Sequence, residues 1–225
     1  MKKLILLAFM LIVNVFAGEV QEVFCGDKSL SYCINHFDRQ CKAKNYNACY
    51  VVGGLYHFEQ EQYSEAKKYY EMVCDKANSE DSFQVELIDG SMGPKLSAII
   101  RMQISCGMLG DFYYNGLGVR QSYEKALQYN KKACDLGNGE SCVLVGHTYY
   151  EGKGVKKDLK TAIKFFAKSC ELESGLGCAA LGALYHDGKG VKQNLSKAKE
   201  LYGKACDLGF QDGCDYYKKL KEKGY

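Results

Sequence analysis

The spacing of the cysteines constrains this chain more than any other sequence feature. The chain of 225 residues has twelve cysteines, and the seven from Cys106 to Cys214 are separated by gaps that alternate between 28 and 8 residues. One long and one short gap together give a period of 36 residues. A fixed period of this size is typical of a stacked repeat array. The sequence therefore predicts successive copies of one supersecondary unit.

Three copies of this unit align in register from Cys106, Cys142 and Cys178. Each copy has a glycine four residues after the cysteine, then a tyrosine, a Gly-x-Gly-Val segment, a small polar residue and an alanine. The recurring residues are Gly110, Gly146 and Gly182; Tyr113, Tyr149 and Tyr185; Ser122, Asp158 and Asn194; Ala126, Ala162 and Ala198. Because these residues recur at the same positions of each copy, we expect the three copies to have the same backbone conformation.

Each copy is predicted to form two antiparallel helices. The Gly-x-Gly segment should end the first helix, since glycine adopts positive φ at low cost. The small polar residue that follows can accept hydrogen bonds from free N–H groups, so it is predicted to cap the second helix. The apolar spacing predicts that the second helix buries Ala126, Tyr129 and Ala133 in one copy and Ala162, Phe165 and Ser169 in the next. Its lysines, such as Lys125, Lys131 and Lys132, are interpreted as a solvated face.

The predicted boundaries cover most of the chain. An earlier copy begins at Tyr46, and in it the residues Glu59-Gln-Glu-Gln62 replace the Gly-x-Gly segment. The array is assigned to 18–225, with units at about 46–76, 103–137, 139–173 and 175–209, a lone second helix at 30–42 and a charged capping helix at 212–223. The insertion at 77–104 contains the single proline, Pro94. It is either a surface excursion or a lid or contact arm beside the array.

Two cysteine registers are possible. Pairing across the gap of 28 would join the two helices of one unit, but it leaves Cys214 and three cysteines at the front without partners. Pairing across the gap of 8 uses every cysteine and joins the end of one unit to the start of the next, where bridging distances are reachable. This preferred register predicts Cys25–Cys33, Cys41–Cys49, Cys74–Cys106, Cys134–Cys142, Cys170–Cys178 and Cys206–Cys214. Zinc is not expected, because the chain has no C-x-x-C pair and no histidines interleaved with cysteines.

The N-terminus is predicted to be a signal peptide, residues 1–17. Lys2 and Lys3 precede an apolar run, Leu4 to Phe16, that is too short to span a bilayer and ends near small residues. Export to an oxidising compartment fits the even number of cysteines. Without those two lysines the chain has 28 basic and 27 acidic residues. We therefore expect neither nucleic acid nor an acidic membrane as a partner, and no transmembrane anchor in the mature chain.

The repeated blocks resemble a known family. The segments Ala-Cys-Asp-Leu-Gly and Tyr-x-x-Gly-x-Gly-Val recur in register and look like the Sel-one-like repeats, which are cousins of the tetratricopeptide repeats. With the C-x7-C spacing, the chain resembles the cysteine-rich secreted proteins of Helicobacter and its relatives over about 30–225. This resemblance implies an all-α, right-handed α-solenoid whose first helices line a concave surface. It also implies either contact with host cells or a penicillin-binding, slowly β-lactam-hydrolysing activity.

The resemblance further implies positions for ligand contacts on the first helices. Tetratricopeptide-like arrays bind peptides through residues near the fifth, ninth and twelfth positions of the first helix. Carried onto this chain, the binding candidates with informative side chains are Tyr50, His57, Asp111, Tyr114, His147, Tyr150 and His186. The expected partners are a peptide, a peptidoglycan-like fragment, a β-lactam or a host protein. The same aromatic residues could instead pack edgewise between units, and the sequence leaves both interpretations open.

A catalytic site is not predicted from the residues themselves. A serine β-lactamase needs an S-x-x-K motif with partners resembling S-D-N and K-T-G. The chain has S-x-x-K at Ser64, Ser122 and Ser196, about as many as chance gives, and only the fragment Lys160-Thr161-Ala162 of the other motifs. The four histidines are scattered, so no metal site or cofactor is expected. An exported binding scaffold is therefore the favoured function, and a β-lactamase is the alternative.

Overall fold

The computed structural model of the chain describes residue 25 and residues 28–76 and 98–225. The predicted signal peptide and most of the predicted insertion lie outside these residues. The described parts contain helices and no strand. They form two compact units. The first contains the described residues up to Ser105 together with Leu117–Val119, and the second contains Cys106–Gly116 and Arg120–Tyr225.

The first unit consists of α3 (Leu30–Lys42), α4 (Tyr46–Gly54), η1 (Leu55–Glu59), α5 (Tyr63–Glu71) and η2 (Met72–Lys76), with the start of α6 (Ala98–Asn115). The segments η1 and η2 are π-helices. Without a Gly-x-Gly segment to end it, α4 continues into η1, and the turn is made at Glu61, which has a φ of 52°. The helix α6 begins at Ala98, inside the segment that the sequence assigned to the insertion, and it crosses the boundary between the two units.

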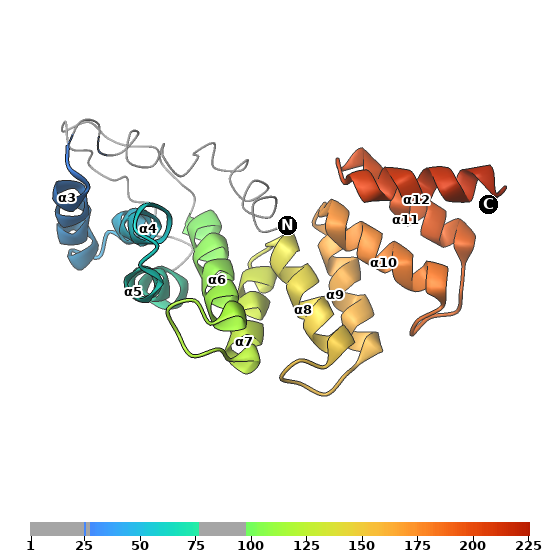
Figure 1. Cartoon of the computed structure of the whole chain (residues 1–225), viewed down its shortest axis with the longest axis horizontal. Coiled ribbons are helices and arrows are strands. Elements are labelled where there is room, and N and C mark those ends of the chain that lie inside the picture. Colours follow the sequence, from blue (N-terminus) through green and yellow to red (C-terminus); the bar gives the residue numbers. More distant parts are fainter. Residues whose placement is uncertain (1–24, 26–27, 77–97) are drawn as a thin grey trace. The chain divides into compact units, whose positions relative to one another are not determined.

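The second unit continues with α7 (Tyr123–Asp135), α8 (Gly139–Glu151), α9 (Leu159–Glu171), α10 (Gly175–Asp187), α11 (Leu195–Asp207) and α12 (Gln211–Glu222) (Figure 1). We call the first helix of each pair the A helix (α4, α6, α8 and α10) and the second the B helix (α5, α7, α9 and α11). From α7 onward each helix packs against the next one in the chain. In addition, α8 contacts α10 and α10 contacts α12. The A helices α8 and α10 therefore form one row with α12.

Local interactions explain where the helices begin and end. The side chains of Ser122, Asp158 and Asn194 accept hydrogen bonds from backbone N–H groups in the first turns of α7, α9 and α11, as predicted. At the end of α8, Gly152 and Gly154 have φ values of 77° and 70°. A Cβ on Gly154 would lie only 2.7 Å from the Cβ of Tyr123. The second glycine thus also lets the loop approach the preceding B helix closely.

The core of the second unit differs from the sequence prediction at one position. Ala126, Ala133, Ala162 and Ser169 are buried as expected. The predicted Tyr129 and Phe165 are only partly buried. They stack on the A-helix rings Tyr113 and Tyr149, with centroids 5.7 and 6.1 Å apart. The following residue of each helix, Asn130 or Phe166, points into the core instead.

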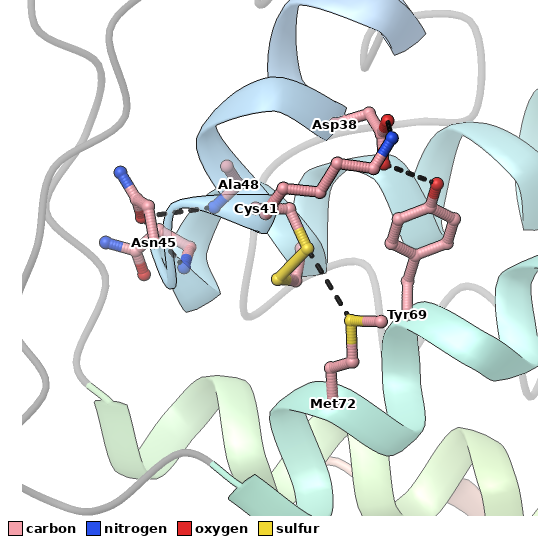
Figure 2. Close-up of a disulfide and its surroundings, with 9 residues drawn as sticks. Asp38, Cys41, Asn45, Ala48, Tyr69 and Met72 are labelled. Atoms are coloured by element: carbon pink, nitrogen blue, oxygen red, sulfur yellow. Dashed lines mark hydrogen bonds and ion pairs between the residues drawn. A yellow bond between two sulfur atoms is a disulfide. The ribbon is translucent and has the colours of Figure 1, made fainter.

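The disulfides follow the preferred register, so pairing across the gap of 28 is wrong. Bridges join Cys25–Cys33, Cys41–Cys49, Cys134–Cys142, Cys170–Cys178 and Cys206–Cys214, each across 8 residues. Cys74 and Cys106 are also disulfide-bonded, and their pairing with each other stays a prediction. Figure 2 shows the bridge at Cys41, whose Sγ lies 3.7 Å from the Sδ of Met72. Nearby, the Tyr69 hydroxyl donates a 2.8 Å hydrogen bond to Asp38. The prediction of an α-solenoid of helix pairs held by C-x7-C disulfides is confirmed.

Candidate binding surface on the A helices

The two candidate residues of the first unit belong to an aromatic cluster. His57 lies on η1, its Nδ1 shares a 3.3 Å hydrogen bond with the hydroxyl of buried Tyr70, and its ring stacks on Phe58. Burial lowers the pKa of His57 to about 4, so the ring is neutral at neutral pH. Tyr50 is partly buried near Tyr70, and burial raises its pKa to about 12. Both residues therefore pack against α5 of the same helix pair, and whether they contact a ligand stays a prediction.

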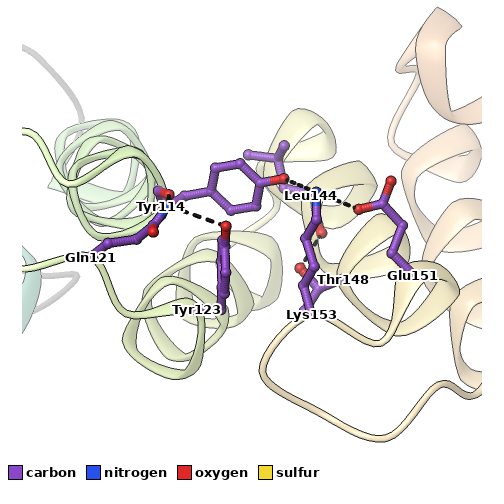
Figure 3. Close-up of polar contacts among 7 residues, drawn as sticks. All are labelled: Tyr114, Gln121, Tyr123, Leu144, Thr148, Glu151 and Lys153. Carbon is purple, nitrogen blue, oxygen red and sulfur yellow. Dashed lines mark hydrogen bonds and ion pairs between the residues drawn. The ribbon is translucent and has the colours of Figure 1, made fainter.

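In the second unit, Tyr114 is held by a lysine from the following repeat. Lys153, in the Gly-x-Gly loop after α8, donates a 2.8 Å hydrogen bond from Nζ to the Tyr114 hydroxyl. The same Nζ pairs with Glu151 at 2.7 Å, and these hydrogen bonds raise the pKa of Lys153. Figure 3 shows Tyr114 and Glu151 converging on this ammonium, with Tyr123 edge-on to the Tyr114 ring. Adjacent repeats are thus joined through polar groups at the loop end of the A helices.

The next repeat has a related arrangement. Lys189 occupies the loop position of Lys153 one period later and pairs with Asp187 at 2.8 Å. The other oxygen of Asp187 lies 2.9 Å from His186 Nδ1, so these three residues form one network. The Lys157 ammonium lies over the Tyr150 ring, 5.3 Å from its centroid. Neither lysine was among the predicted site residues, although their repeated Gly-Lys-Gly context was a visible signal.

His147 and Asp111 occupy equivalent positions on α8 and α6, one residue after the glycine that recurs in each repeat, Gly146 or Gly110. The His147 ring is exposed but packs edge-on against Phe166, with centroids 5.2 Å apart, and the resulting desolvation lowers its pKa. Asp111 is partly buried, and burial raises its pKa to about 6. Within the part of the chain that the structure describes, no cation pairs with the Asp111 carboxylate.

Replacing Asp111 with asparagine is expected to stabilise the fold at neutral pH. The folded-state pKa of about 6 exceeds the ordinary value of 3.8. Protonated Asp111 therefore favours folding below about pH 4, and this contribution is lost as the pH rises through 6. We expect Asp111→Asn to raise the free energy of unfolding by about 1–3 kcal/mol at pH 7.5 and to change it little at pH 4. Urea unfolding at both pH values measures this, with exposed Glu124→Gln as control. An equal effect of Asp111→Asn at both pH values would contradict it.

The serines considered as nucleophiles are not placed beside an available base. The Ser122 hydroxyl accepts a 3.3 Å hydrogen bond from the backbone N–H of Lys125 and acts as a helix cap. Lys67, which follows Ser64, pairs with Glu71 at 2.9 Å, and Lys199, which follows Ser196, donates to the Tyr225 carbonyl. Among the described residues, no group of three or more His, Cys, Asp or Glu side chains is placed to hold a metal ion. No described helix has the length and apolar character that a membrane span requires.

Comparison with known proteins identifies the repeats. The Sel1 repeat profile matches residues 47–78, 104–138, 139–174 and 175–210. No curated protein sequence compared with the chain matches it. A Sel1 repeat protein from Oxalobacter formigenes is 16% identical, with 92% of this chain and 83% of that chain covered and a TM-score of 0.63, which supports the fold.

Two further solved structures are similar over parts of their length. The Helicobacter pylori cysteine-rich protein B is 36% identical over 52% of this chain and 90% of that chain, with a TM-score of 0.43. The protective antigen c5321 from uropathogenic Escherichia coli is 22% identical over 95% of this chain and 55% of that chain, with a TM-score of 0.48. The profile matches cover more than half of the chain, so it belongs to the Sel1 repeat family.

Proposed function

We propose that this protein is an exported interaction scaffold that binds an extended peptide along the A helices of its second unit. Sel1 repeats mediate protein–protein interactions, and the chain is a disulfide-rich member of that family. The observation that supports the proposal is that α6, α8 and α10 carry Asp111, Tyr114, His147, Tyr150 and His186 at repeated positions of successive repeats. A peptide segment of a host protein or of a cell-wall component would supply the partner.

The chemistry of this row suits a peptide better than a reacting substrate. Tyr114 combines an apolar ring with a hydroxyl that is held by Lys153, and the Lys157 ammonium lies over the Tyr150 ring, 5.3 Å from its centroid. Aromatic side chains of this kind supply contact area at low cost in conformational entropy, and fixed hydroxyls and ammonium groups can bond to peptide carbonyls. No assembled nucleophile and base are found on the described residues, so no observation favours the β-lactamase alternative.

Truncation of the two tyrosines should weaken peptide binding. We expect the double variant Tyr114→Ala/Tyr150→Ala to bind the best peptides of an array at least about tenfold more weakly, since each ring is a potential hot spot of 2 kcal/mol or more. Fluorescence polarisation with purified protein measures the affinity. Tyr32→Ala is the matched control, because Tyr32 is 51% exposed on α3 of the first unit. Equal binding by both variants, or no binding peptide at all, would overturn the proposal.

Export is the second part of the proposal. The disulfides are typical of an extracellular or periplasmic protein, since the cytosol keeps thiols reduced. We propose that residues 1–17 are removed, so the mature chain should begin at Gly18. Intact mass spectrometry of the protein from its native source checks this. The mass should match residues 18–225 with all twelve cysteines oxidised, and alkylation without reductant should add nothing. A mass that includes residues 1–17 would refute the cleavage.

A further inference from the structure

Three loops that join an A helix to its B helix carry an exposed cation at the same position. In the loops after α6, α8 and α10, a valine follows the last glycine of the Gly-x-Gly segment, and the next residue is Arg120, Lys156 or Lys192. All three side chains are exposed. None of them makes a hydrogen bond or an ion pair with another described residue. We call these three residues the cation row.

The backbone holds the three loops in the same conformation. Two residues after each cation, the N–H of the helix cap donates a 2.9 Å hydrogen bond to a tyrosine carbonyl of the A helix. These bonds run from Ser122 to Tyr113, from Asp158 to Tyr149 and from Asn194 to Tyr185. The members of the cation row therefore occupy equivalent places in successive repeats.

Each of the later loops also lies against the helix that follows the previous loop. A Cβ on Gly154 would be 2.7 Å from the Cβ of Tyr123, at the start of α7. A Cβ on Gly190 would be 2.9 Å from the Cβ of Leu159, at the start of α9. The loops are thus neighbours in space, and the cation row follows one edge of the array.

Positive charge gathers at this edge. The three loops contain six lysines and arginines and a single acid, Asp158, in residues 116–122, 152–158 and 188–194. The Asp158 carboxylate is occupied, since it accepts hydrogen bonds from backbone N–H groups of α9. The lysines of the two Gly-Lys-Gly segments pair with the acids that end their A helices. The turns at the opposite helix ends, residues 136–138, 172–174 and 208–210, contain no cation.

The cation row lies beside two of the candidate binding residues. Lys153, in the same loop as Lys156, donates a hydrogen bond to the Tyr114 hydroxyl. Lys157, which follows Lys156, lies over the Tyr150 ring. A peptide that contacts these two tyrosines would therefore pass next to exposed cations that have no carboxylate partner on the described chain.

The spacing of the repeats sets the spacing of a matching ligand. Packed helix axes lie about 8–10 Å apart, and α8 contacts α10, so neighbouring members of the cation row should be about that far apart. A polyproline II segment has about three residues per turn and rises about 3.1 Å per residue, so every third side chain lies on the same side, about 9 Å further along. In a β-strand, side chains on one face are about 6.6 Å apart, which matches less well.

We propose that the cation row binds an acidic peptide segment in the polyproline II conformation, with a carboxylate at every third residue. Each carboxylate would pair with one member of the row. A single exposed ion pair contributes little affinity, so selectivity depends on several pairs in register along a segment that is already extended before it binds. The proposal rests on the proposed function, because it names the charge and the register of the peptide ligand.

The direct test uses short blocked peptides and the complete mature protein. The first peptide has three Glu-Pro-Ala repeats, the second has the same composition with its glutamates consecutive, and the third has glutamine in place of glutamate. Each is titrated into isotope-labelled protein, and backbone amide shifts are recorded by NMR. We expect the first peptide to shift the signals of Arg120, Lys156 and Lys192, with a dissociation constant on the order of 1 mM. Raising the NaCl concentration from about 50 to about 500 mM should weaken this binding several-fold, because salt screens exposed charges.

The other two peptides decide between charge, register and nonspecific contact. The glutamine peptide should bind at least about tenfold more weakly, and the peptide with consecutive glutamates at least about threefold more weakly. Equal binding of the glutamine peptide would refute recognition of carboxylates, and equal binding of the isomer would refute the register. If heparin, a sulfated glycan, moves the signals of the cation row and none of the peptides does, an acidic peptide is the wrong partner.

Variants separate the cation row from general electrostatic attraction. The triple variant Arg120→Gln/Lys156→Gln/Lys192→Gln should weaken binding of the Glu-Pro-Ala peptide at least about tenfold, since all three pairs are lost. The matched control removes the same charge from exposed lysines elsewhere in the second unit, with Lys131→Gln, Lys204→Gln and Lys218→Gln. Equal weakening by the control would overturn the proposal. The comparison of peptides on the unmodified protein decides the question even if a variant does not fold.

The outcome also distinguishes this proposal from the proposed function. If peptides lose affinity in Tyr114→Ala/Tyr150→Ala but not in the triple loop variant, the cation row is wrong and the scaffold function stands. If the Glu-Pro-Ala peptide binds the cation row and the variant without the two tyrosines binds it equally well, the row stands and the proposed surface on the A helices is wrong.

Discussion

Full reduction of the disulfides is expected to remove most of the stability of the helix array. Each described bridge closes a loop across only 8 residues, and the loop-entropy relation gives about 2.5 kcal/mol for a loop of that length. Together the five described bridges contribute a free energy comparable with the whole stability of a typical domain, about 5–15 kcal/mol. A stack of helix pairs has mostly local contacts and no single large core that could offset this loss.

Circular dichroism during thermal unfolding, with and without reductant, measures this effect. We expect the fully reduced chain to be largely unfolded at about 37 °C, with most of its helical signal lost and no cooperative transition on further heating. Removal of one bridge, Cys170→Ser with Cys178→Ser, should lower the free energy of unfolding by about 2.5 kcal/mol. Complete reduction, verified by alkylation, that leaves the transition unchanged would show that helix packing alone maintains the array.

Phe166→Ala is expected to destabilise the second unit strongly. The Phe166 ring is 2% exposed, contacts Gly146 on α8 and packs against the His147 ring. Truncation of a fully buried phenylalanine leaves a cavity and costs about 3–5 kcal/mol. The neighbouring Phe165 is the matched control, because it has the same chemistry but is partly exposed and stacks on Tyr149. Phe165→Ala should cost about 1–2 kcal/mol.

Urea unfolding followed by circular dichroism compares these two variants. The sequence analysis assigned the core position to Phe165, whereas the structure assigns it to Phe166. A larger loss of stability in Phe165→Ala than in Phe166→Ala would therefore contradict the structure at this position. Similar decreases in the free energy of unfolding would indicate that both rings contribute equally to the packing between α8 and α9.

Much of the fold could be predicted because it depends on short-range chemistry. The caps at Ser122, Asp158 and Asn194 need only a side-chain acceptor in front of free N–H groups. The turns at Gly152 and Gly154 need only a residue that tolerates positive φ. The prediction of helix ends was less accurate where other residues replace the Gly-x-Gly segment. Without glycines, the A helix of the first unit continues as the π-helix η1, and nothing in Glu59-Gln-Glu-Gln62 indicated a change in hydrogen-bond register.

The sequence predicted where the candidate site residues lie along the helices, but not their burial, hydrogen-bond partners or pKa values. Its side chains were placed on successive A helices by the repeat alone. Their environments depend on groups farther along the sequence: Lys153 reaches Tyr114 across 39 residues, and Tyr70, 13 residues from His57, shares a hydrogen bond with it and packs edge-on against its ring. That α7 buries Asn130 and leaves Tyr129 partly exposed became visible only in the structure.

By itself, the sequence determined the period of 36 residues, the helical class, the helix caps and a disulfide register in which every cysteine has a partner. These follow from spacing, since residues at a fixed period occupy equivalent positions in every copy. Only the tertiary structure decided which of two adjacent aromatic residues enters the core. Neighbouring residues on a helix point about 100° apart, and the arc that becomes buried is set by how the A and B helices pack. That packing placed Phe166 and Asn130 inside the core.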